Sequence, residues 1–185
     1  MPNTASNVTA GKPNVGGAIY QAPIGTSLPT DTITGLSDFT CLGYVSDDGL
    51  VNSNTPNGNT NVKAWGGDTV LTILGDKVDQ FKFTLLEVLN VDVLKTVFGS
   101  ANVTGDLSSE IVIKSNSSDL DEFSYAIDMI MRDNTVKRIV IPRAKVTSIG
   151  DIAYTDGDAV GYEITIDCYP DSNGNTHYEY IKKNS

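Results

Sequence analysis

Alternating apolar and polar residues predict a chain built mainly of half-buried β-strands. Three segments carry this pattern most clearly: 79–85, 123–132 and 160–168. Turn-forming sequences lie at 46–49, where they predict a hairpin, and at 171–175, where they predict a second hairpin near the C-terminus. The pattern therefore predicts a largely antiparallel β-sandwich in which several strands have one apolar and one polar face.

A helical period replaces the alternation after residue 90. Val91, Leu94 and Phe98 follow one another at helical spacing, which predicts one short amphipathic helix. Asn90 is placed to accept a hydrogen bond from the first-turn amides, and Gly99 is placed to end the helix as a left-handed cap. One short α-helix is therefore expected to flank the strands.

The large apolar residues of this region form the predicted core. Trp65 is followed by Gly66 and Gly67 and is expected to pack against the helix, because the glycines let the backbone bend beside a large ring. On this basis Trp65→Ala should lower the free energy of unfolding by about 3–5 kcal/mol. The predicted core and helix-packing residues are Trp65, Phe81, Phe83, Leu94 and Phe98.

The length of 185 residues fits one domain with a flanking arm. Residues 1–17 are rich in Asn, Thr, Gly and Pro and are expected to form a flexible N-terminal arm before a single domain over 18–185. Residues 52–61, NSNTPNGNTN, carry no large apolar side chain and are expected to form a mobile loop. Neither segment can bury itself, so both are candidates for contact with a partner.

The net charge of −10 argues against a surface that binds phosphate backbones or an anionic membrane. No apolar run approaches the roughly 20 residues that a membrane-spanning helix needs, and the N-terminal segment does not resemble a signal sequence, so a cytoplasmic site of synthesis is expected. Cys41 and Cys168 lie far apart in the sequence. They are expected to be buried free thiols, with a disulfide across the sandwich as the alternative.

Motifs for catalysis or ligand binding are weak. The single histidine, His177, has no nucleophile motif beside it, so a hydrolytic triad is not expected. Asp171, Asn173 and Asn175 have calcium-loop spacing, but Gly174 is misplaced for the sharp turn, and a hairpin turn explains them better. The sequence therefore predicts no enzyme, no cofactor and no metal site.

Four runs carry a resemblance to a known family. They are LGYVSDDGLV (42–51), WGG (65–67), FKFTLLEVLNVDVLKTVFGSANVTG (81–105) and VKRIVIPRAKVTSIGDIAYTDGDAVGYEITIDCYPDSNGNTHYEY (136–180). These runs resemble the major tail proteins, or tail tube proteins, of long-tailed siphophages. The resemblance implies a β-sandwich with one flanking helix, the phage tail tube fold, in which long hairpins of neighbouring subunits join into one barrel.

The resemblance also implies a structural role in the virion. Homohexameric rings would stack into a tube around the tape-measure protein, and genomic DNA would later pass through it without specific binding. Tail terminator and distal tail proteins would bind the two ends, and assembly would take place in the bacterial host cytoplasm without a membrane. The alternatives are the tube of a contractile tail or of a type VI-like secretion machine, and, from another class, a β-sandwich receptor-binding module.

An acidic subunit suits such a tube, because carboxylates repeated around a narrow bore repel phosphate at short range. Four strands from each of six subunits would give a barrel with a backbone diameter of roughly 45–50 Å. The polar strand faces are candidates for the lumen wall, although an outer solvated face explains them equally well. The lumen-lining candidates are Gln80, Lys82, Thr84, Asp128, Arg132, Glu163, Thr165 and Asp167. The candidates for contacts between rings, from the arm and the loop, are Asn7, Lys12, Asn14, Asn54, Pro56, Asn57 and Asn59.

Overall fold

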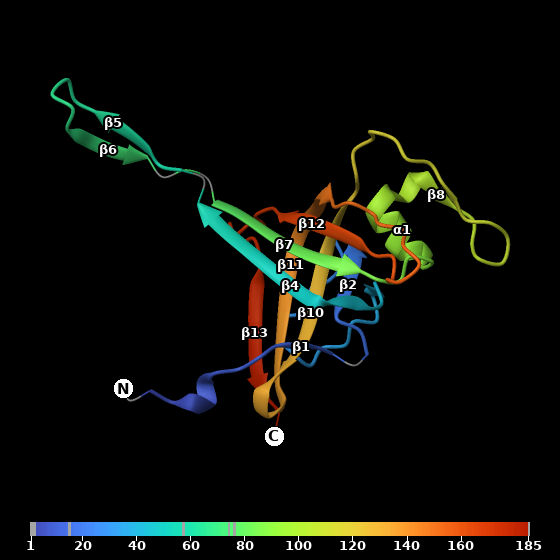
Figure 1. Cartoon of the computed structure of the whole chain (residues 1–185). Helices are drawn as coiled ribbons and strands as arrows, with labels where there is room; N and C mark the ends of the chain where they lie inside the picture. Colours follow the sequence, from blue (N-terminus) through green and yellow to red (C-terminus); the bar gives the residue numbers. More distant parts are fainter. Residues whose placement is uncertain (1–2, 15, 57, 74, 76, 185) are drawn as a thin grey trace.

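The structure, a computed structural model, describes residues 3–14, 16–56, 58–73, 75 and 77–184. This part of the chain is mainly antiparallel β-structure with one α-helix, α1 (Val91–Phe98), and three short 3₁₀ turns. Figure 1 shows a twisted β-body from which one hairpin projects. The strands of the body are β1 (Lys12–Pro13), β2 (Ile19–Pro23), β3 (Thr40–Cys41), β4 (Val45–Pro56), β7 (Lys77–Leu85), β10 (Glu122–Met131), β11 (Thr135–Ile149), β12 (Tyr162–Cys168) and β13 (Tyr178–Lys183). The strands outside it are β5 (Thr60–Lys63), β6 (Thr69–Ile73), β8 (Val103–Thr104) and β9 (Val112–Ile113).

One continuous strand, β11, joins the two layers of the sandwich. The sheet order is β3-β2-β10-β11-β12-β7-β4, with β1 added to β10 and β13 added to β11. Strand β11 pairs with β10 over residues 135–145, with β13 over 135–140 and with β12 over 144–149. Pro142 lies inside β11, which continues through it with a register shift against β10. A proline is tolerated at such an irregularity because no ladder hydrogen bond has to be donated there.

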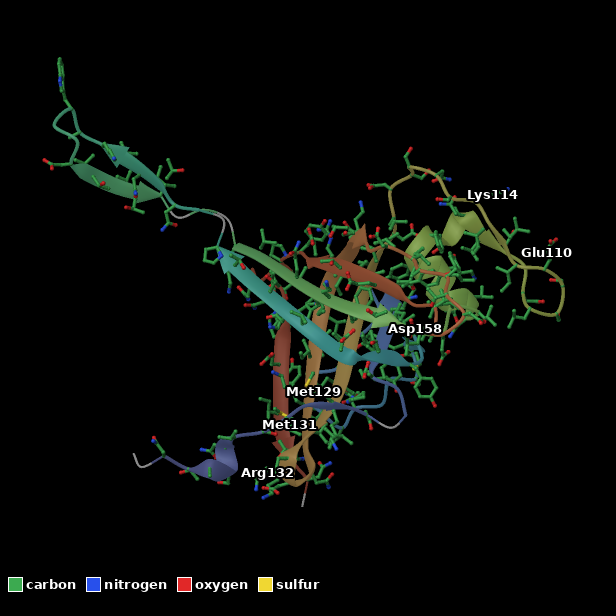
Figure 2. The ribbon with its side chains drawn as sticks, viewed as in Figure 1. Glu110, Lys114, Met129, Met131, Arg132 and Asp158 are labelled. Atoms are coloured by element: carbon green, nitrogen blue, oxygen red, sulfur yellow. The ribbon has the colours of Figure 1, made fainter. Side chains whose placement is uncertain are left out.

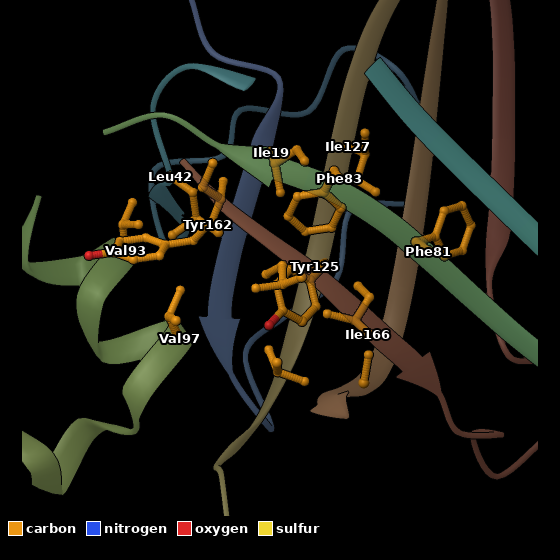
Figure 3. Close-up of a cluster of buried hydrophobic side chains, with 14 of the residues drawn as sticks. Ile19, Leu42, Phe81, Phe83, Val93, Val97, Tyr125, Ile127, Tyr162 and Ile166 are labelled. Carbon is orange, nitrogen blue, oxygen red and sulfur yellow. The ribbon is translucent and has the colours of Figure 1, made fainter. Parts of the chain in front are cut away.

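The core lies between these two layers. Phe81 and Phe83 of β7 and Ile166 of β12 face Tyr125 and Ile127 of β10, and all five are buried (Figure 3). The predicted alternation appears in 79–85 and 162–168 as buried positions that alternate with half-buried or exposed ones. Burial of these side chains is the main stabilising term of the fold.

Helix α1 closes one end of the sandwich, as expected. The Asn90 side chain accepts a hydrogen bond from the Asp92 amide at 3.0 Å and so caps the first turn. The Phe98 ring contacts the Tyr162 ring edge to face, with centroids 5.5 Å apart. Gly99 ends the helix with φ 95° and ψ 139°, a positive φ that favours glycine but lies outside the left-handed helical region predicted for it.

Two predicted turns differ from the structure around β4. The predicted hairpin at 46–49 is wrong, because β4 runs through these residues and they form an irregularity in its pairing with β7 between Val45 and Leu50. Gly49 has φ 76° there, so the turn-like composition reflects a bulge rather than a reversal of the chain. The predicted mobile loop at 52–61 is wrong for residues 52–56, which pair with β7. Their polar side chains are compatible with an exposed edge strand, in which the backbone rather than the side chains makes the stabilising bonds.

Part of the N-terminal arm is paired with the body. Strand β1 pairs with Ile130 and Met129 of β10, and the Thr9 hydroxyl accepts a hydrogen bond from the Arg132 amide at 2.8 Å.

The two cysteines, Cys41 and Cys168, are free thiols. Burial raises the pKa of the Cys168 thiol well above its ordinary value, so this side chain stays protonated.

The position of Trp65 also differs from the expectation. Strands β5 and β6 form a separate two-stranded sheet, and Trp65 lies at the turn between them, fully exposed. The turn is closed by a hydrogen bond from the Gly67 amide to the Ala64 carbonyl at 2.9 Å, with φ 92° at Gly67. The predicted packing of Trp65 on Leu94 and Phe98 is therefore wrong. The two glycines shape a hairpin tip instead of a bend beside the helix.

Candidate assembly surfaces

One continuous polar face covers the layer made of β4, β7, β12 and the second half of β11. Cross-strand pairing places Thr84 beside Glu163, Lys82 beside Thr165, and Gln80 beside Asp167. Because these residues alternate with buried ones, their side chains share the side of the layer that faces away from the core. Six of the eight predicted lumen residues therefore lie together on this face, which we call the polar face.

The charged groups on the polar face are compensated within it. The Lys82 ammonium lies 2.9 Å from a Glu163 carboxylate oxygen. An Asp167 carboxylate oxygen accepts hydrogen bonds from the Gln80 amide and from the Thr147 hydroxyl, both at 2.7 Å. One cation and two carboxylates leave a charge of −1 on the six residues, so the face carries no excess of positive charge.

Both lateral edges of this layer are open within the described part of the chain. Strand β4 pairs only with β7 there, and Ser148 and Ile149 of β11 pair only with β12. Open strand edges present unpaired backbone donors and acceptors that can pair with another chain. The layer therefore has the geometry of a segment of a larger sheet.

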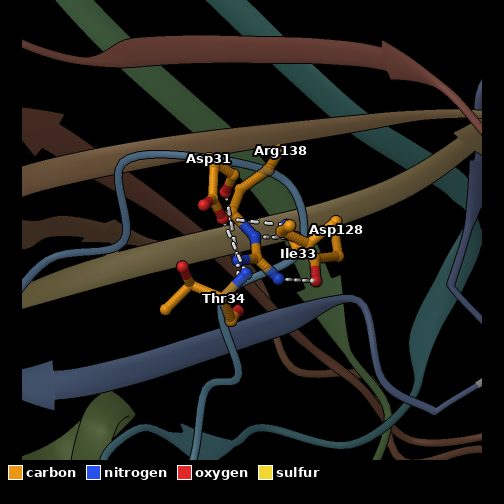
Figure 4. A network of polar contacts seen from close by, with 5 residues as sticks. All are labelled: Asp31, Ile33, Thr34, Asp128 and Arg138. Atoms are coloured by element: carbon orange, nitrogen blue, oxygen red, sulfur yellow. Dashed lines mark hydrogen bonds and ion pairs between the residues drawn. The ribbon is translucent and has the colours of Figure 1, made fainter.

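Two predicted lumen residues, Asp128 and Arg132, lie elsewhere. Arg132 is exposed at the turn that follows β10 (Figure 2). Asp128 is buried, and the prediction that it lines a lumen is wrong. It is held by Arg138, with Nε donating to one carboxylate oxygen at 2.7 Å and Nη2 to the other at 2.8 Å (Figure 4).

The Asp128–Arg138 pair anchors the surface segment 24–37, whose conformation the sequence does not indicate. The Arg138 Nη1 group donates to the Thr34 carbonyl at 2.6 Å and to the Asp31 carbonyl at 3.2 Å. The hydrogen bonds to Asp128 raise the pKa of Arg138 further, so the guanidinium is permanently charged. The same segment covers a small second apolar cluster on the outer side of the sheet, formed by Ala22, Phe39 and Ala126 with Leu28 and Leu36.

A second buried carboxylate, Asp79, joins β7 to the segment just before β13. Asp79 accepts hydrogen bonds from the Asn52 amide at 2.9 Å and from the Thr176 hydroxyl at 2.5 Å, and it contacts His177 Nδ1. Burial by itself would raise the pKa of Asp79, but the hydrogen bonds from Thr176, Asn52 and His177 outweigh it, and the net pKa is lowered. The charged form of Asp79 is therefore favoured in the folded state.

We expect Asp79 to contribute a pH-dependent part of the stability. Since the folded-state pKa lies below the ordinary 3.8, this contribution is complete above pH 3.8 and is lost as the pH falls through the folded-state value. Asp79→Asn should lower the free energy of unfolding at neutral pH by about 1–3 kcal/mol. Denaturant unfolding of both proteins between neutral and acidic pH should show the difference shrinking below pH 4.

The control is Asp158→Asn, which changes an exposed loop aspartate. Its unfolding curves should follow those of the parent protein throughout. A difference between Asp79→Asn and the parent that stays constant down to acidic pH would contradict the assigned role of the Asp79 charge.

The predicted inter-ring candidates are dispersed over the surface. Asn7 is exposed in the 3₁₀ turn at 5–7, Lys12 is exposed in β1, and Asn14 is half-buried beside β10. Asn54 and Pro56 are exposed in the edge strand β4, and Asn59 is exposed just before β5, whereas Asn57 lies outside the described residues. Residues 171–175 form a tight turn, in which the Asp171 carboxylate accepts from the Asn173 amide at 2.8 Å and the Asn175 amide at 3.0 Å. The hairpin predicted there is wrong, because β12 and β13 each pair with β11 and not with each other.

Comparison with known proteins assigns the chain to a family. Among the described residues, no helix has the length and apolar character that crossing a bilayer requires. A search of curated proteins gives no match. The family model described as "Phage tail tube protein" matches residues 2–185. The chain therefore belongs to the phage tail tube protein family and is a structural component of a phage tail.

Proposed function

We propose that the chain builds the tail tube of a long, non-contractile siphophage tail as stacked six-fold rings, with the polar face directed toward the lumen. Within each ring, the open edge of β4 would pair with the open edge at residues 146–149 of β11 in the next subunit. This pairing would close one barrel around the bore and remove both open edges.

The observation that carries the proposal is the coincidence of a polar face with two open edges on the same layer. Four strands, β4, β7, β12 and β11, form that layer. Six such layers closed edge to edge give a backbone diameter of roughly 45–50 Å, which leaves room for a DNA duplex inside the side chains. A layer whose polar face was covered, or whose edges were already paired, could not form such a wall.

The electrostatics of the polar face support passage of DNA without binding. Phosphate contacts from free Lys or Arg side chains would retain the duplex, and many stacked rings would multiply that effect. Here Lys82 is paired with Glu163, and Lys145, the cross-strand neighbour of Asp167 on β11, is paired with Asp119. Neither lysine is therefore free to hold phosphate.

The remaining partners follow from this proposed role. The tape-measure protein would occupy the lumen during assembly, and tail terminator and distal tail proteins would bind the two ends. Assembly would take place in the host cytoplasm. The arm at 1–17 and the residues Asn54, Pro56 and Asn59 remain proposed contacts between rings.

Electron microscopy of the purified protein, combined with a charge reversal, tests the proposal. We expect hollow tubes with six-fold cross-sections, and we expect Glu163→Lys with Asp167→Lys to leave subunit folding and tubes intact. In virions that carry this double variant, DNA ejection should slow, because each ring gains cations that contact phosphate. Ejection rate against salt concentration is the measurement, since added phosphate contacts are weakened by salt.

The matched control reverses two carboxylates in an exposed loop, Asp156→Lys with Asp158→Lys, and so makes the same change in net charge. It should eject DNA at the parental rate. Unchanged ejection by the polar-face variant, with normal tubes, would place the polar face outside the lumen. Isolated monomers or trimers instead of tubes would overturn the tube itself, and binding of a contractile sheath to the tubes would assign them to a contractile tail or a related machine.

A further inference from the structure

The projecting hairpin at residues 58–73, which we call the hairpin arm, gathers its apolar strand residues on one face, except for Val70 at the register shift. Val62 pairs with Leu71, and Ile73 follows on the same face because residues two apart in a strand share a side. On the other face, the Thr72 hydroxyl donates to the Asn61 side chain at 2.8 Å. The arm therefore has the amphipathic pattern of a hairpin that covers another surface.

The described part of the same chain does not supply that other surface. Every residue of β5 and β6 is exposed, including Val62, Leu71 and Ile73, and Trp65 at the tip is 106% exposed. An isolated two-stranded hairpin is marginally stable in water. A tryptophan held at its tip is a typical anchor residue of a protein interface.

An apolar groove of matching character lies beside α1, at the far side of the body from the arm (Figure 1). The groove has a volume of about 460 Å³ and lies between α1, the loop at 106–113 and the chain before β12. Among its lining residues, Leu89, Leu107 and Tyr154 are strongly exposed, with 63%, 67% and 76% of their surface accessible. Exposed large apolar side chains that gather around one groove mark an interaction site.

Charges of opposite sign lie on the two surfaces. Asp106 and Glu110 lie at the groove and are exposed (Figure 2 shows Glu110 on its loop). Hydrogen bonds from Ser108 and Ser109 lower the pKa of Asp106, so its carboxylate is ionised. On the arm, Lys63 lies two residues before Trp65 and Asp68 lies three residues after it, and both are exposed. An indole in the groove thus brings Lys63 toward two carboxylates, while Asp68 adds one carboxylate at the tip.

A larger groove, between β1, β4 and β10, suits the arm less well. Its apolar residues Val45, Leu50 and Met129 are partly buried, so it adds few exposed apolar side chains to the interface. It also adjoins the edge of β4 that the proposed ring closes. The groove beside α1 has no lining residue from β4.

We propose that the hairpin arm of one copy docks on a second copy of this chain, with Trp65 inserted into the groove formed by Leu89, Leu107 and Tyr154. The inference rests on the proposed self-assembly into a tube. The arm and the groove are different surfaces, so the contact is head to tail, and a contact of this kind continues from copy to copy. Aromatic insertion then adds affinity and register to the backbone pairing of the strand edges.

The test uses the fact that Trp65 is the only tryptophan of the chain. Two single variants are prepared: Leu107→Glu, which keeps the arm and spoils the groove, and Trp65→Ala, which keeps the groove and removes the anchor. Both changed side chains are exposed, so both variants should fold. In an equimolar mixture, the only tryptophan belongs to the first variant and the only intact groove to the second.

We expect tryptophan emission from the mixture to move to shorter wavelength, because the indole leaves water for an apolar groove. The shift should saturate at one Trp65→Ala chain per Leu107→Glu chain. The control replaces Trp65→Ala by the double variant Trp65→Ala with Leu107→Glu, which offers no groove and should give no shift. The concentration of the Trp65→Ala chain that gives half of the shift should rise about tenfold or more when this chain also carries Tyr154→Ala.

Unchanged emission in the mixture would overturn the docking proposal, as would a shift that the groove-less double variant also produces. Neither result bears on the tube, because wild-type tubes are scored separately by electron microscopy. If the wild-type chain forms no tubes and the mixture still shifts, the docking contact stands and the tube proposal fails.

Discussion

Arg138→Ala is expected to lower the free energy of unfolding by about 3–5 kcal/mol, the typical cost of leaving one partner of a buried ion pair without the other. Arg138 and Asp128 are 4% and 6% exposed, and two short hydrogen bonds join them. The substitution would leave the Asp128 carboxylate buried without a cation. It would also remove the donor for the Thr34 and Asp31 carbonyls, so segment 24–37 should exchange its amide hydrogens faster.

The neighbouring lysine supplies the control. Lys137 pairs with Glu179 at 2.7 Å near the surface, and Lys137→Ala should cost about 0–1 kcal/mol. Replacing the buried pair by apolar residues, Asp128→Leu with Arg138→Met, should recover part of the loss measured for Arg138→Ala. Equal costs for Arg138→Ala and Lys137→Ala in chemical denaturation would show that the buried pair is not a stability determinant.

Phe83→Ala is expected to lower the free energy of unfolding by about 3–5 kcal/mol, because it opens a cavity between the two layers. Phe83 is 2% exposed and lies beside Tyr125 (Figure 3). Trp65→Ala removes a larger side chain and should change the same free energy by no more than about 0.5 kcal/mol. Thermal or denaturant unfolding of the two variants measures the contrast, and a costly Trp65→Ala would place the indole in the folded core of the subunit.

These two aromatic residues show what the sequence could and could not indicate. Phe83 belongs to an alternating run, and that period alone predicts a buried face. Trp65 stands outside any period, and hydrophobicity by itself does not tell whether a large side chain is buried in its own subunit or in a partner. The exposed Val62, Leu71 and Ile73 of the arm were missed for the same reason.

The buried ionic groups were partly visible in the pattern. Asp79 lies on the same side of the strand as Phe81 and Phe83. A carboxylate on this apolar face needs a hydrogen-bonding or charged partner. Its partners Asn52 and Thr176 are distant in the sequence and could not be identified from spacing. Asp128 was assigned to the polar face because its cation, Arg138, lies on another strand, and the covering segment 24–37 has no regular period.

The polar segment at 52–56 shows the limit of composition as a guide. Low hydrophobicity predicted a loop, yet these residues extend β4 along the edge of the polar face. An edge strand whose two faces both contact water needs no apolar side chains, since backbone hydrogen bonds and one buried neighbour strand hold it. Sequence reasoning was therefore reliable for strands that bury a face and unreliable for the strand at the edge.

The passage of β11 through both layers has a mechanical consequence. A sandwich whose layers are joined only by loops can shear when force is applied to one of them. Here the same backbone, with ladder bonds on both sides of Pro142, ties the wall layer to the outer layer. In a tube built as proposed, bending of the tail would therefore be taken up at the joints between subunits, where hairpin arms can slide or swing, while each subunit moves as a stiff block.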